Sequence, residues 1–361
     1  MKDLYVKDLE DLIEKPIESV FVVAKAEARH RKTGERYLVV VLSDRTGKIE
    51  GTVFDNVEVL EPILTRGQVV RIRGQVGLYQ NAPRVRIQAA SVVEEYDMTD
   101  LIPSSPHDIS SMFYEMQSLL NTLQNPYLRE LVAVLFEDTE FVEKLKKAPA
   151  AIRYHHNYMG GLLEHTLNLL RLANVVAATY PSVDRDLLLV GALLHDIGKI
   201  DEYTLFPVIE QTDEGRLLGH ILMGYERVQK AMDRVRERKG DFPEELRLRL
   251  LHLILSHHGE LAKGSPVEPR TLEAQILHFL DYLDSRVWMF EEAAQHPTEP
   301  GARWSEYWKP LSRSVFIGGM EENSPASSPD FHMDLSEPPR PSSSSEEGPT
   351  SHPSDKEGLF G

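Results

Sequence analysis

Histidine and aspartate side chains lie beside apolar segments in the middle of the chain. His195 and Asp196 directly follow the apolar run 187–194, which we expect to be a buried helix. Burying an imidazole beside a carboxylate costs several kcal/mol unless both find partners, and a metal ion is one such partner. The chain contains no cysteine, which excludes disulfides, Fe–S clusters and thiolate nucleophiles. Any metal must therefore be held by histidine and carboxylate.

Further candidate ligands lie on or next to segments whose apolar residues recur at three- and four-residue spacing: His165, His220, His257, His258, Asp281 and Asp284. Each alone is better explained as a hydrogen-bonded core or surface residue. Their order on consecutive apolar segments favours a shared site for a divalent metal, to which histidine and carboxylate are suited. The sequence leaves open whether His258 substitutes for His257, and whether Asp284 substitutes for Asp281.

Other chemistries lack their motifs. The glycine-rich loops that cradle phosphates and the Gly-x-Ser-x-Gly nucleophile elbow are both absent. A second His-Asp pair, His107 and Asp108, lies in a polar stretch and is expected to be a solvated loop.

The first part of the chain is expected to be a β-barrel. Apolar and polar residues alternate in segments 18–29, 36–42, 49–54, 68–79 and 84–93, and a short helix can fill 56–64. Five strands with a helix between the third and fourth is the element order of an OB-fold barrel. Such barrels bind single strands by stacking bases on aromatic rings and tracking phosphates with cations.

The barrel segment offers aromatic and basic residues for that role. We select these as nucleic-acid contacts: Tyr37, Tyr79, Lys25, Arg29, Arg71, Arg73, Arg84 and Arg86. Arg31 and Lys32 are further cationic candidates. Phe21 and Phe54 are better explained as barrel core, and Arg71 and Arg73 alternate with apolar residues as a solvated face would.

The remainder is expected to be helical and then unstructured. Helical spacing covers 128–136, 162–176, 186–194, 244–255 and 271–290. We therefore expect a fold with an N-terminal all-β barrel domain at 1–98, a linker at 99–111 and an all-α domain at 112–318. Residues 319–361 are rich in Ser, Pro and acidic groups and are expected to be a disordered tail.

Charge and hydropathy set further limits. The 361 residues carry a net charge of −17, but residues 1–97 are nearly balanced, with 15 basic and 16 acidic side chains. The barrel can therefore present a local basic face. The N-terminus lacks the apolar region of a signal peptide, and the run 187–194 is far shorter than the roughly 20 residues that span a bilayer. We expect a cytoplasmic protein without a membrane segment.

Two motifs carry a resemblance to a known family. The segment 160–166, Gly-Gly-Leu-Leu-Glu-His-Thr, and the segment 195–199, His-Asp-Ile-Gly-Lys, resemble the HD-domain metal-dependent phosphohydrolases. With the barrel in front, the chain is similar to the YhaM-type 3′→5′ exoribonucleases. The resemblance implies hydrolysis of phosphodiester bonds in single-stranded RNA, with single-stranded DNA as a second substrate.

The resemblance also implies site residues. His165, His195, Asp196 and Asp281 match the primary metal site, and His220 and His257 match a second metal site that Asp196 bridges. Lys199 matches a lysine near the substrate phosphate. The expected cofactor is one or two divalent ions, Mn²⁺ first, with Mg²⁺, Co²⁺ or Fe²⁺ as alternatives.

The residues leave some roles open. A metal-bound water, Lys199 or His156 could protonate the leaving oxygen, and His155 and His156 could border the substrate. The alternative functions are a phosphohydrolase of nucleotides or cyclic dinucleotides and a non-catalytic single-strand-binding protein. A homo-oligomer is left open.

Overall fold

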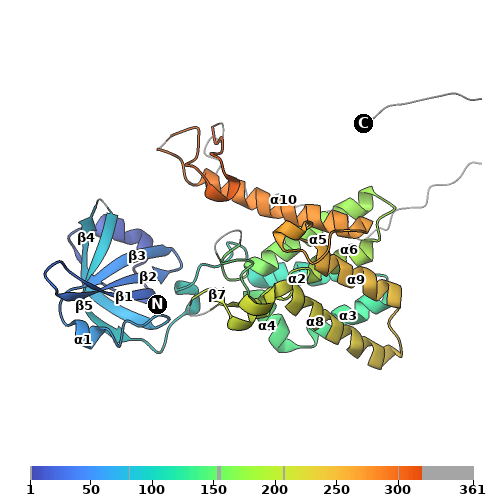
Figure 1. The fold of residues 1–361 in the computed structure, drawn as a ribbon, viewed down its shortest axis with the longest axis horizontal. Coiled ribbons are helices and arrows are strands. Elements are labelled where there is room, and N and C mark those ends of the chain that lie inside the picture. The colour runs from blue at the N-terminus through green and yellow to red at the C-terminus, as the bar shows by residue number, and fades with distance from the viewer. Residues whose placement is uncertain (1, 81, 153–155, 206–207, 300, 319–361) are drawn as a thin grey trace, which may run out of the picture.

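The structure, a computed structural model, describes residues 2–80, 82–152, 156–205, 208–299 and 301–318. Figure 1 shows a β-barrel at one end of the long axis and a bundle of helices at the other. The tail 319–361 and His155, both considered above, lie outside the described residues. No helix in the described ranges combines the length and the apolar composition that a membrane span requires.

The barrel is built from strands β1 (Pro16–His30), β2 (Arg36–Asp44), β3 (Gly47–Val53), β4 (Val69–Tyr79) and β5 (Ala82–Val92). They close in the order β1-β2-β3-β5-β4, with β3 and β5 parallel and the other pairs antiparallel. The short helix α1 (Val57–Leu60) lies between β3 and β4 in sequence. Alternate residues such as Phe21, Val40 and Ile72 are fully buried in the interior. The predicted OB-fold is confirmed, and the expected helix 56–64 is a single turn.

The segment 99–111, expected to be a linker, carries two buried apolar residues ahead of its polar stretch 103–111. Leu101 and Ile102 are buried, and Leu101 packs on Val22 and Val69 at the base of the barrel. Farther on, Pro103 O accepts a hydrogen bond of 2.8 Å from the backbone N–H of Met159. The segment therefore packs against both domains.

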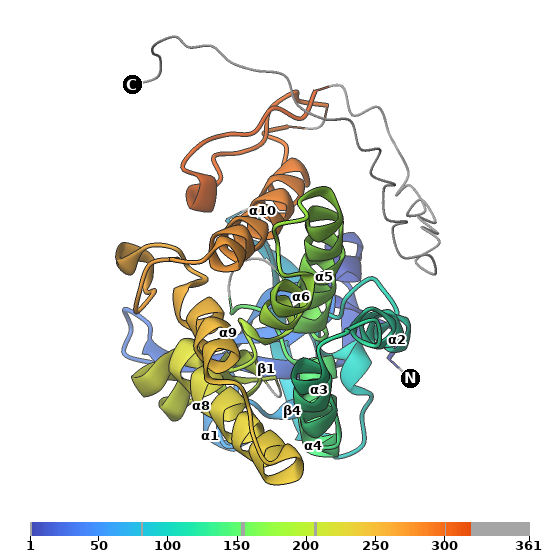
Figure 2. The ribbon, with the colours of Figure 1, turned by 90° about the vertical axis from the view of Figure 1, so that its right-hand side faces the viewer.

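The second domain contains the helices α2 (Ile109–Leu120), α3 (Pro126–Phe136), α4 (Thr139–Lys147), α5 (Gly161–Thr179), α6 (Arg185–Leu194), α7 (Lys199–Glu202), α8 (Asp213–Lys239), α9 (Glu244–Ser256) and α10 (Leu272–Ala294). Residues 187–194 of α6 are all buried, as their uniformly apolar sequence predicts. Figure 2 shows α6 in the middle of the bundle, with α5, α9 and α10 around it. The expected helical domain is confirmed, although short strands β6 (Tyr203–Thr204) and β7 (Glu210–Gln211) also pair within it.

Candidate metal centre and nucleic-acid groove

The ends and faces of α5 to α10 bring the predicted ligands together. His165 lies in the first turns of α5, His195 ends α6, and His257 ends α9. His220 follows a kink in α8 at Gly219, whose φ of 76° lies in the left-handed region that favours glycine. Asp281 lies on α10. Side chains from five helices thus meet at Asp196.

One group of these side chains surrounds Oδ2 of Asp196. His195 Nε2 lies 3.3 Å from this oxygen and 3.2 Å from Nε2 of His165. His165 Nε2 lies 3.3 Å from Oδ1 of Asp281. His165 and His195 are fully buried, so the atoms that converge here are shielded from solvent.

A second group surrounds Oδ1 of the same carboxylate. His220 Nε2 lies 3.4 Å away and His257 Nε2 lies 3.5 Å away, and His258 can supply a fourth donor atom within 4.8 Å of the others. Oδ1 of Asp196 and both of these Nε2 atoms are buried and have no hydrogen-bond partner among the described residues. Unpaired buried polar atoms are costly, and histidine nitrogens with carboxylate oxygens are suitable divalent-metal ligands. The residues present fit a pair of metal sites that share Asp196.

Backbone carbonyls orient two of the histidines in the same way. Nδ1 of His195 lies 2.9 Å from Ala192 O, and Nδ1 of His257 lies 2.7 Å from Ile254 O, three residues back in each case. The last carbonyls of a helix lack partners within the helix, so each ring satisfies one of them. We assign the Nδ1–H tautomer to both rings. The Nε2 atom of each ring, which faces Asp196, then carries a lone pair that can bind a metal ion.

Acidic residues orient the other two histidines. Asp284 Oδ2 lies 2.7 Å from Nδ1 of His165, and Glu202 Oε2 lies 3.1 Å from Nδ1 of His220. Asp284 also accepts a 3.0 Å hydrogen bond from Asn168 Nδ2 through its other oxygen. Asp284 therefore holds His165 through Nδ1, while Asp281 lies on the Nε2 side of the same ring. Nothing in the sequence pattern assigns a role to Glu202.

Several pKa values are displaced at this centre. Burial would lower the pKa of His165, but contacts with Asp281 and Asp284 outweigh it and raise that pKa to about 10. Burial would raise the pKa of Asp196, but Lys199 and His195 lower it well below its ordinary value. Burial lowers the pKa of His257, and burial together with His257 lowers the pKa of His258 to about 4. The rings of His257 and His258 are thus kept unprotonated and able to act as ligands.

A small pocket opens onto this centre. Its volume is about 220 Å³, and it is lined by Asp196, Lys199, His258, Lys263, His278, Asp281, Tyr282 and Ser285. Lys199 is buried and its Nζ donates a 2.6 Å hydrogen bond to Asp196 Oδ2. The predicted phosphate-binding lysine therefore lies at the pocket and beside the bridging carboxylate.

His156 occupies a different position from the one expected of a group at the substrate. It is buried, its Nε2 lies 3.2 Å from Asp284 Oδ2, and its Nδ1 lies 2.8 Å from the hydroxyl of Tyr158. These contacts place it behind His165 and outside the lining of the pocket. Its expected role as a proton donor to the leaving group stays a prediction.

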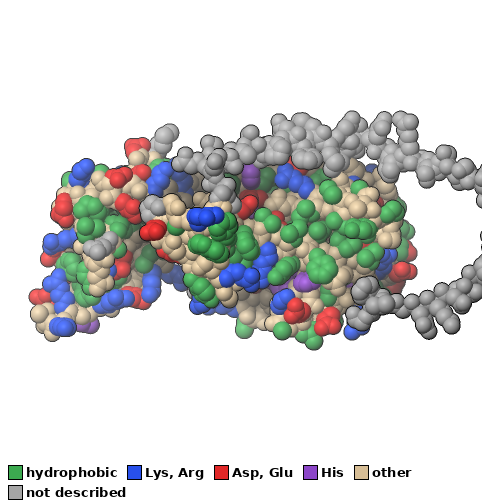
Figure 3. All heavy atoms as spheres, turned by 90° about the horizontal axis from the view of Figure 1, so that it is seen from above, with side chains coloured by type: hydrophobic (Ala, Val, Ile, Leu, Met, Phe, Trp, Pro, Cys, Tyr) green, Lys and Arg blue, Asp and Glu red, His purple; other side chains and the backbone are tan. Residues whose placement is uncertain are grey.

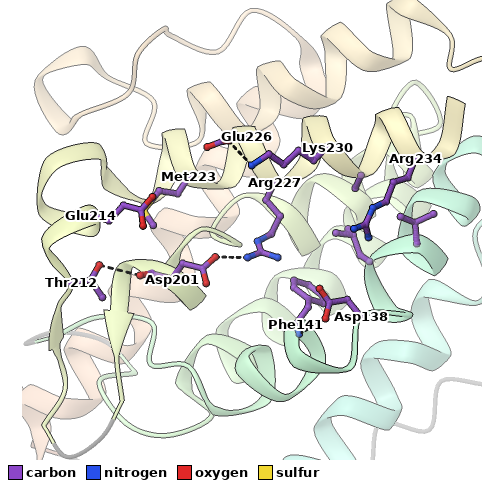
Figure 4. A pocket seen from close by; sticks show the side chains of 13 residues that line it. Asp138, Phe141, Asp201, Thr212, Glu214, Met223, Glu226, Arg227, Lys230 and Arg234 are labelled. Atoms are coloured by element: carbon purple, nitrogen blue, oxygen red, sulfur yellow. Dashed lines mark hydrogen bonds and ion pairs between the residues drawn. The ribbon is translucent and has the colours of Figure 1, made fainter. Parts of the chain in front are cut away.

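The short helix α7 is fixed from its opposite side. Figure 4 shows Asp201 reaching Arg227 of α8 across a second pocket of about 410 Å³ that lies between α3, α4, α7 and α8. Asp201 also accepts a 3.1 Å hydrogen bond from Lys144 Nζ of α4. Because α7 is only one turn long, these contacts determine where Lys199 and Glu202 point.

The barrel carries a groove of about 550 Å³ with aromatic and basic walls. Its lining includes Tyr37, Phe54, Tyr79, Arg31, Arg84 and Arg86. The Tyr37 and Phe54 rings are 5.8 Å apart, and the Arg84 guanidinium lies 4.1 Å from the Tyr79 ring centre. This is the combination that OB-folds use for single strands.

Phe54 is expected in the barrel core from sequence, and that interpretation is wrong. Phe54 directly follows the end of β3 and lines the groove, where Arg31 lies 4.3 Å from its ring centre. The core interpretation of Phe21 is confirmed by its complete burial.

The other basic residues selected on the barrel lie outside the groove lining. Lys25 and Arg29 pair with Glu27, and Arg71 and Arg73 pair with Glu18. Figure 3 shows basic and acidic side chains interspersed over the barrel end of the molecule on the face seen from above. The role of these four residues as nucleic-acid contacts stays a prediction.

Family profiles match both domains. The HD domain family matches residues 162–286, and a family described as OB-fold nucleic acid binding domain matches residues 22–93. Among solved structures, the second OB-fold domain of replication protein A from Methanococcus maripaludis aligns with 24% of this chain and 89% of its own length. Its sequence identity is 19% and its TM-score 0.18.

Two curated relatives align with most of the chain. A 3′-5′ exoribonuclease YhaM from Geobacillus sp. (strain WCH70) is 32% identical over 295 residues, which cover 79% of this chain and 89% of the relative. A second protein of that name, from Bacillus velezensis (strain DSM 23117 / BGSC 10A6 / LMG 26770 / FZB42), is 30% identical over 303 residues, covering 83% and 94%. With its barrel, its helical HD domain and its identity to these relatives, the chain belongs to the YhaM 3′-5′ exoribonuclease family.

Proposed function

We propose that this protein is a metal-dependent 3′→5′ exoribonuclease that hydrolyses single-stranded RNA, with single-stranded DNA as a second substrate. The observation that carries the proposal is the position of Asp196 between two groups of histidines. Each of its oxygens faces a different group, and Nε2 of His220 and Nε2 of His257 have no hydrogen-bond partner among the described residues. The relatives named YhaM supply the reaction and its direction.

Different residues bind the metal ions and stabilise charge on the phosphate during hydrolysis. A divalent ion at such a centre lowers the pKa of a bound water and offsets charge on phosphoryl oxygens. His165, His195, Asp196 and Asp281 would hold the first ion, and Asp196, His220, His257 and His258 the second. Lys199 lines the pocket through which a phosphate reaches Asp196, so its ammonium group can stabilise negative charge that develops on that phosphate.

The groove on the barrel supports a polymeric substrate. A hydrolase of nucleotides or cyclic dinucleotides needs no separate surface of aromatic rings and arginines. The groove lined by Tyr37, Phe54 and Arg84 therefore favours the exonuclease over that alternative. A binding protein without catalysis is disfavoured because it would have no need of buried, unpaired His257 and Asp196 atoms.

The test uses a single-stranded RNA labelled at its 5′ end, with DNA of the same sequence in parallel. We expect products that shorten one nucleotide at a time from the 3′ end. The activity should be higher with Mn²⁺ than with Mg²⁺, Co²⁺ or Fe²⁺, and no products should form in EDTA. Hydrolysis of cyclic dinucleotides with no shortening of RNA would favour the nucleotide hydrolase. Binding without hydrolysis under every metal would favour the non-catalytic alternative. We place this activity in the cytoplasm.

A further inference from the structure

The pocket at the metal centre has an aromatic wall that the metal chemistry does not use. Tyr282 follows Asp281 on α10, lines the pocket and leaves 44% of its surface exposed. Among the described residues, the hydroxyl group of Tyr282 orients no metal ligand. The Tyr282 ring is too exposed to contribute to the core. An exposed aromatic ring one residue from a metal-facing carboxylate is therefore available to the substrate.

The ring beside it is held in place by the backbone of the loop after α9. His278 lies one turn before Tyr282, with ring centres 6.4 Å apart, and its Nδ1 lies 2.8 Å from His257 O. At Gly259, whose φ is 81°, a Cβ would lie 2.3 Å from the His278 ring. Glycine is required at this position both for its φ and for this contact. The segment that carries the metal-site residue His257 therefore also positions the His278 ring beside Tyr282.

Two cations lie over the Tyr282 ring. Arg286, one turn farther along α10, lies 4.8 Å from its centre, and Lys263 of the 3₁₀ helix Leu261–Lys263 lies 5.5 Å from it. Lys263 also lines the pocket, and its backbone O lies 3.0 Å from Nδ1 of His258. An aromatic platform with neighbouring cations is how single strands are bound without sequence preference. The barrel groove has the same composition, with Tyr79 beside Arg84.

The size of the pocket limits what this platform can take. At about 220 Å³ it is smaller than the roughly 300–1,000 Å³ that drug-sized ligands occupy. One terminal nucleotide fits such a space better than a folded or cyclic substrate, with the remainder of the strand outside.

We propose that Tyr282 is the platform for the 3′-terminal nucleobase, which seats the last phosphodiester against Asp196 and Asp281. This proposal rests on the exonuclease function proposed above. It adds a base-binding subsite in the helical domain that is separate from the groove on the barrel. Because every base has a stacking face, the subsite accepts all of them, as an exonuclease that degrades mixed sequences requires.

The test combines a change in the protein with a change in the substrate. Two RNAs labelled at the 5′ end are compared, one with a normal 3′-terminal nucleotide and one whose terminal nucleotide lacks its base. For the first cleavage by the unaltered protein, we expect kcat/KM to fall about ten-fold when the base is removed, the order of one base–aromatic stack. Tyr282→Ala should show the same ten-fold loss on normal RNA and little further loss on the abasic RNA. Tyr282→Phe should retain normal behaviour.

Tyr114→Ala is the matched control, because Tyr114 is 73% exposed on α2 and away from the pocket. It should leave both rates unchanged. Equal losses on both RNAs with Tyr282→Ala, or no loss at all, would overturn the platform and assign Tyr282 a merely structural role or none. Failure of the exonuclease function looks different, because the unaltered protein would then shorten neither RNA. Calorimetric titration with Mn²⁺ alone should give the same affinity for Tyr282→Ala as for the unaltered protein.

Discussion

Oδ1 of Asp196 lies 3.5 Å from Nε2 of His257, yet neither atom has a hydrogen-bond partner among the described residues. Each unpaired buried atom costs about 1–3 kcal/mol relative to its solvated state. A cation between the two atoms would satisfy both. The contact between Nδ1 of His257 and Ile254 O directs Nε2 of His257 toward this position. The end of α9 therefore sets where this atom lies relative to Asp196.

The first prediction concerns the bridging carboxylate. Asp196→Asn should lower RNA hydrolysis by more than about 100-fold, since losing even an outer partner of a metal ligand costs about 10–100-fold. RNA affinity, measured by fluorescence anisotropy, should stay nearly normal because the groove lies on the barrel. Asp233→Asn, which changes an exposed carboxylate on α8, is the control and should retain full activity. Near-normal turnover by a folded Asp196→Asn protein would rule out the metal-site assignment.

The second prediction counts the ions. Dialysis against Mn²⁺ followed by elemental analysis should give two ions per chain, and His257→Ala should retain one, at the group that contains His165. His252→Ala should retain two, because His252 lies on α9 but accepts a hydrogen bond from the backbone N–H of Arg270. Metal should also raise Tm, since saturation at 100 times Kd stabilises the fold by about 2.7 kcal/mol. One ion in both variants and in the unaltered protein would exclude the shared centre.

Much of this centre could be predicted from sequence because its ligands end or interrupt long apolar runs. The run 187–194 identifies a buried helix, and a histidine that directly follows it needs a partner. Glu202 has no such signal, and only the packing of α7 against α8 gives it a histidine partner. Asp284 is a candidate ligand from sequence, but only the packing of α10 against α5 shows that it contacts Nδ1 of His165.

Other features could not be predicted, for identifiable reasons. The helix α8 is largely polar and is kinked at Gly219, so its apolar spacing is too weak and interrupted to indicate one helix. The residue type of Phe54 favours the core, although its side chain lines the groove just after the end of β3. Serines and prolines indicate the polar stretch 103–111, but they do not indicate that Leu101 and Ile102, which precede it, are buried.

The third prediction is a proton release on metal binding. The pKa of His165, raised to about 10 by Asp281 and Asp284 against the effect of burial, keeps this ring protonated at pH 8 without metal. Because this folded pKa exceeds the ordinary value of about 6.5, its contribution to stability is complete below pH 6.5 and is lost as pH rises through about 10. A histidine must be neutral to bind a metal ion, so Mn²⁺ should displace this proton and bind more tightly as pH rises.

Calorimetry at pH 8, in buffers of different ionisation enthalpy, measures that release. Asp284→Asn removes one carboxylate that holds the proton, so fewer protons should be released than by the unaltered protein. Glu164→Gln is the control, since this buried acid contacts Ser105, Tyr158 and His156, whereas Asp284 is the acid that holds Nδ1 of His165. The same release from Asp284→Asn and the unaltered protein would contradict the assignment.

The fourth prediction separates the barrel groove from its outer face. Replacing Arg84 and Arg86 by alanine should weaken RNA binding and reduce the slope of log K against log salt by about 1.4, or about 0.7 for each phosphate that is no longer neutralised. The same change at Arg71 and Arg73, which lie outside the groove lining, should have a smaller effect. Filter binding between 50 and 200 mM salt, about the range over which such electrostatic binding is resolved, provides the measurement. A greater weakening from the second pair would move the RNA path to the outer face.

The last prediction concerns the anchor of α7. Asp201 joins this one-turn helix to Arg227 of α8 and Lys144 of α4, on the side away from the metal centre. Asp201→Ala should leave α7 free to shift, which displaces both Lys199, on Asp196, and Glu202, on His220. We expect a loss of kcat of about 10–100-fold, the range for residues that orient metal ligands. KM for RNA should change little, because the groove is untouched.

Lys230→Ala is the control for this anchor, since Lys230 lines the same pocket but pairs only with Glu226 of its own helix among the described residues (Figure 4). It should keep normal kcat. Arg227→Ala should reproduce part of the loss of kcat seen in Asp201→Ala. The double variant should lose no more kcat than Asp201→Ala alone, because both changes break the same ion pair. Additive losses would show that the two residues act separately and that α7 is positioned by something other than their pairing.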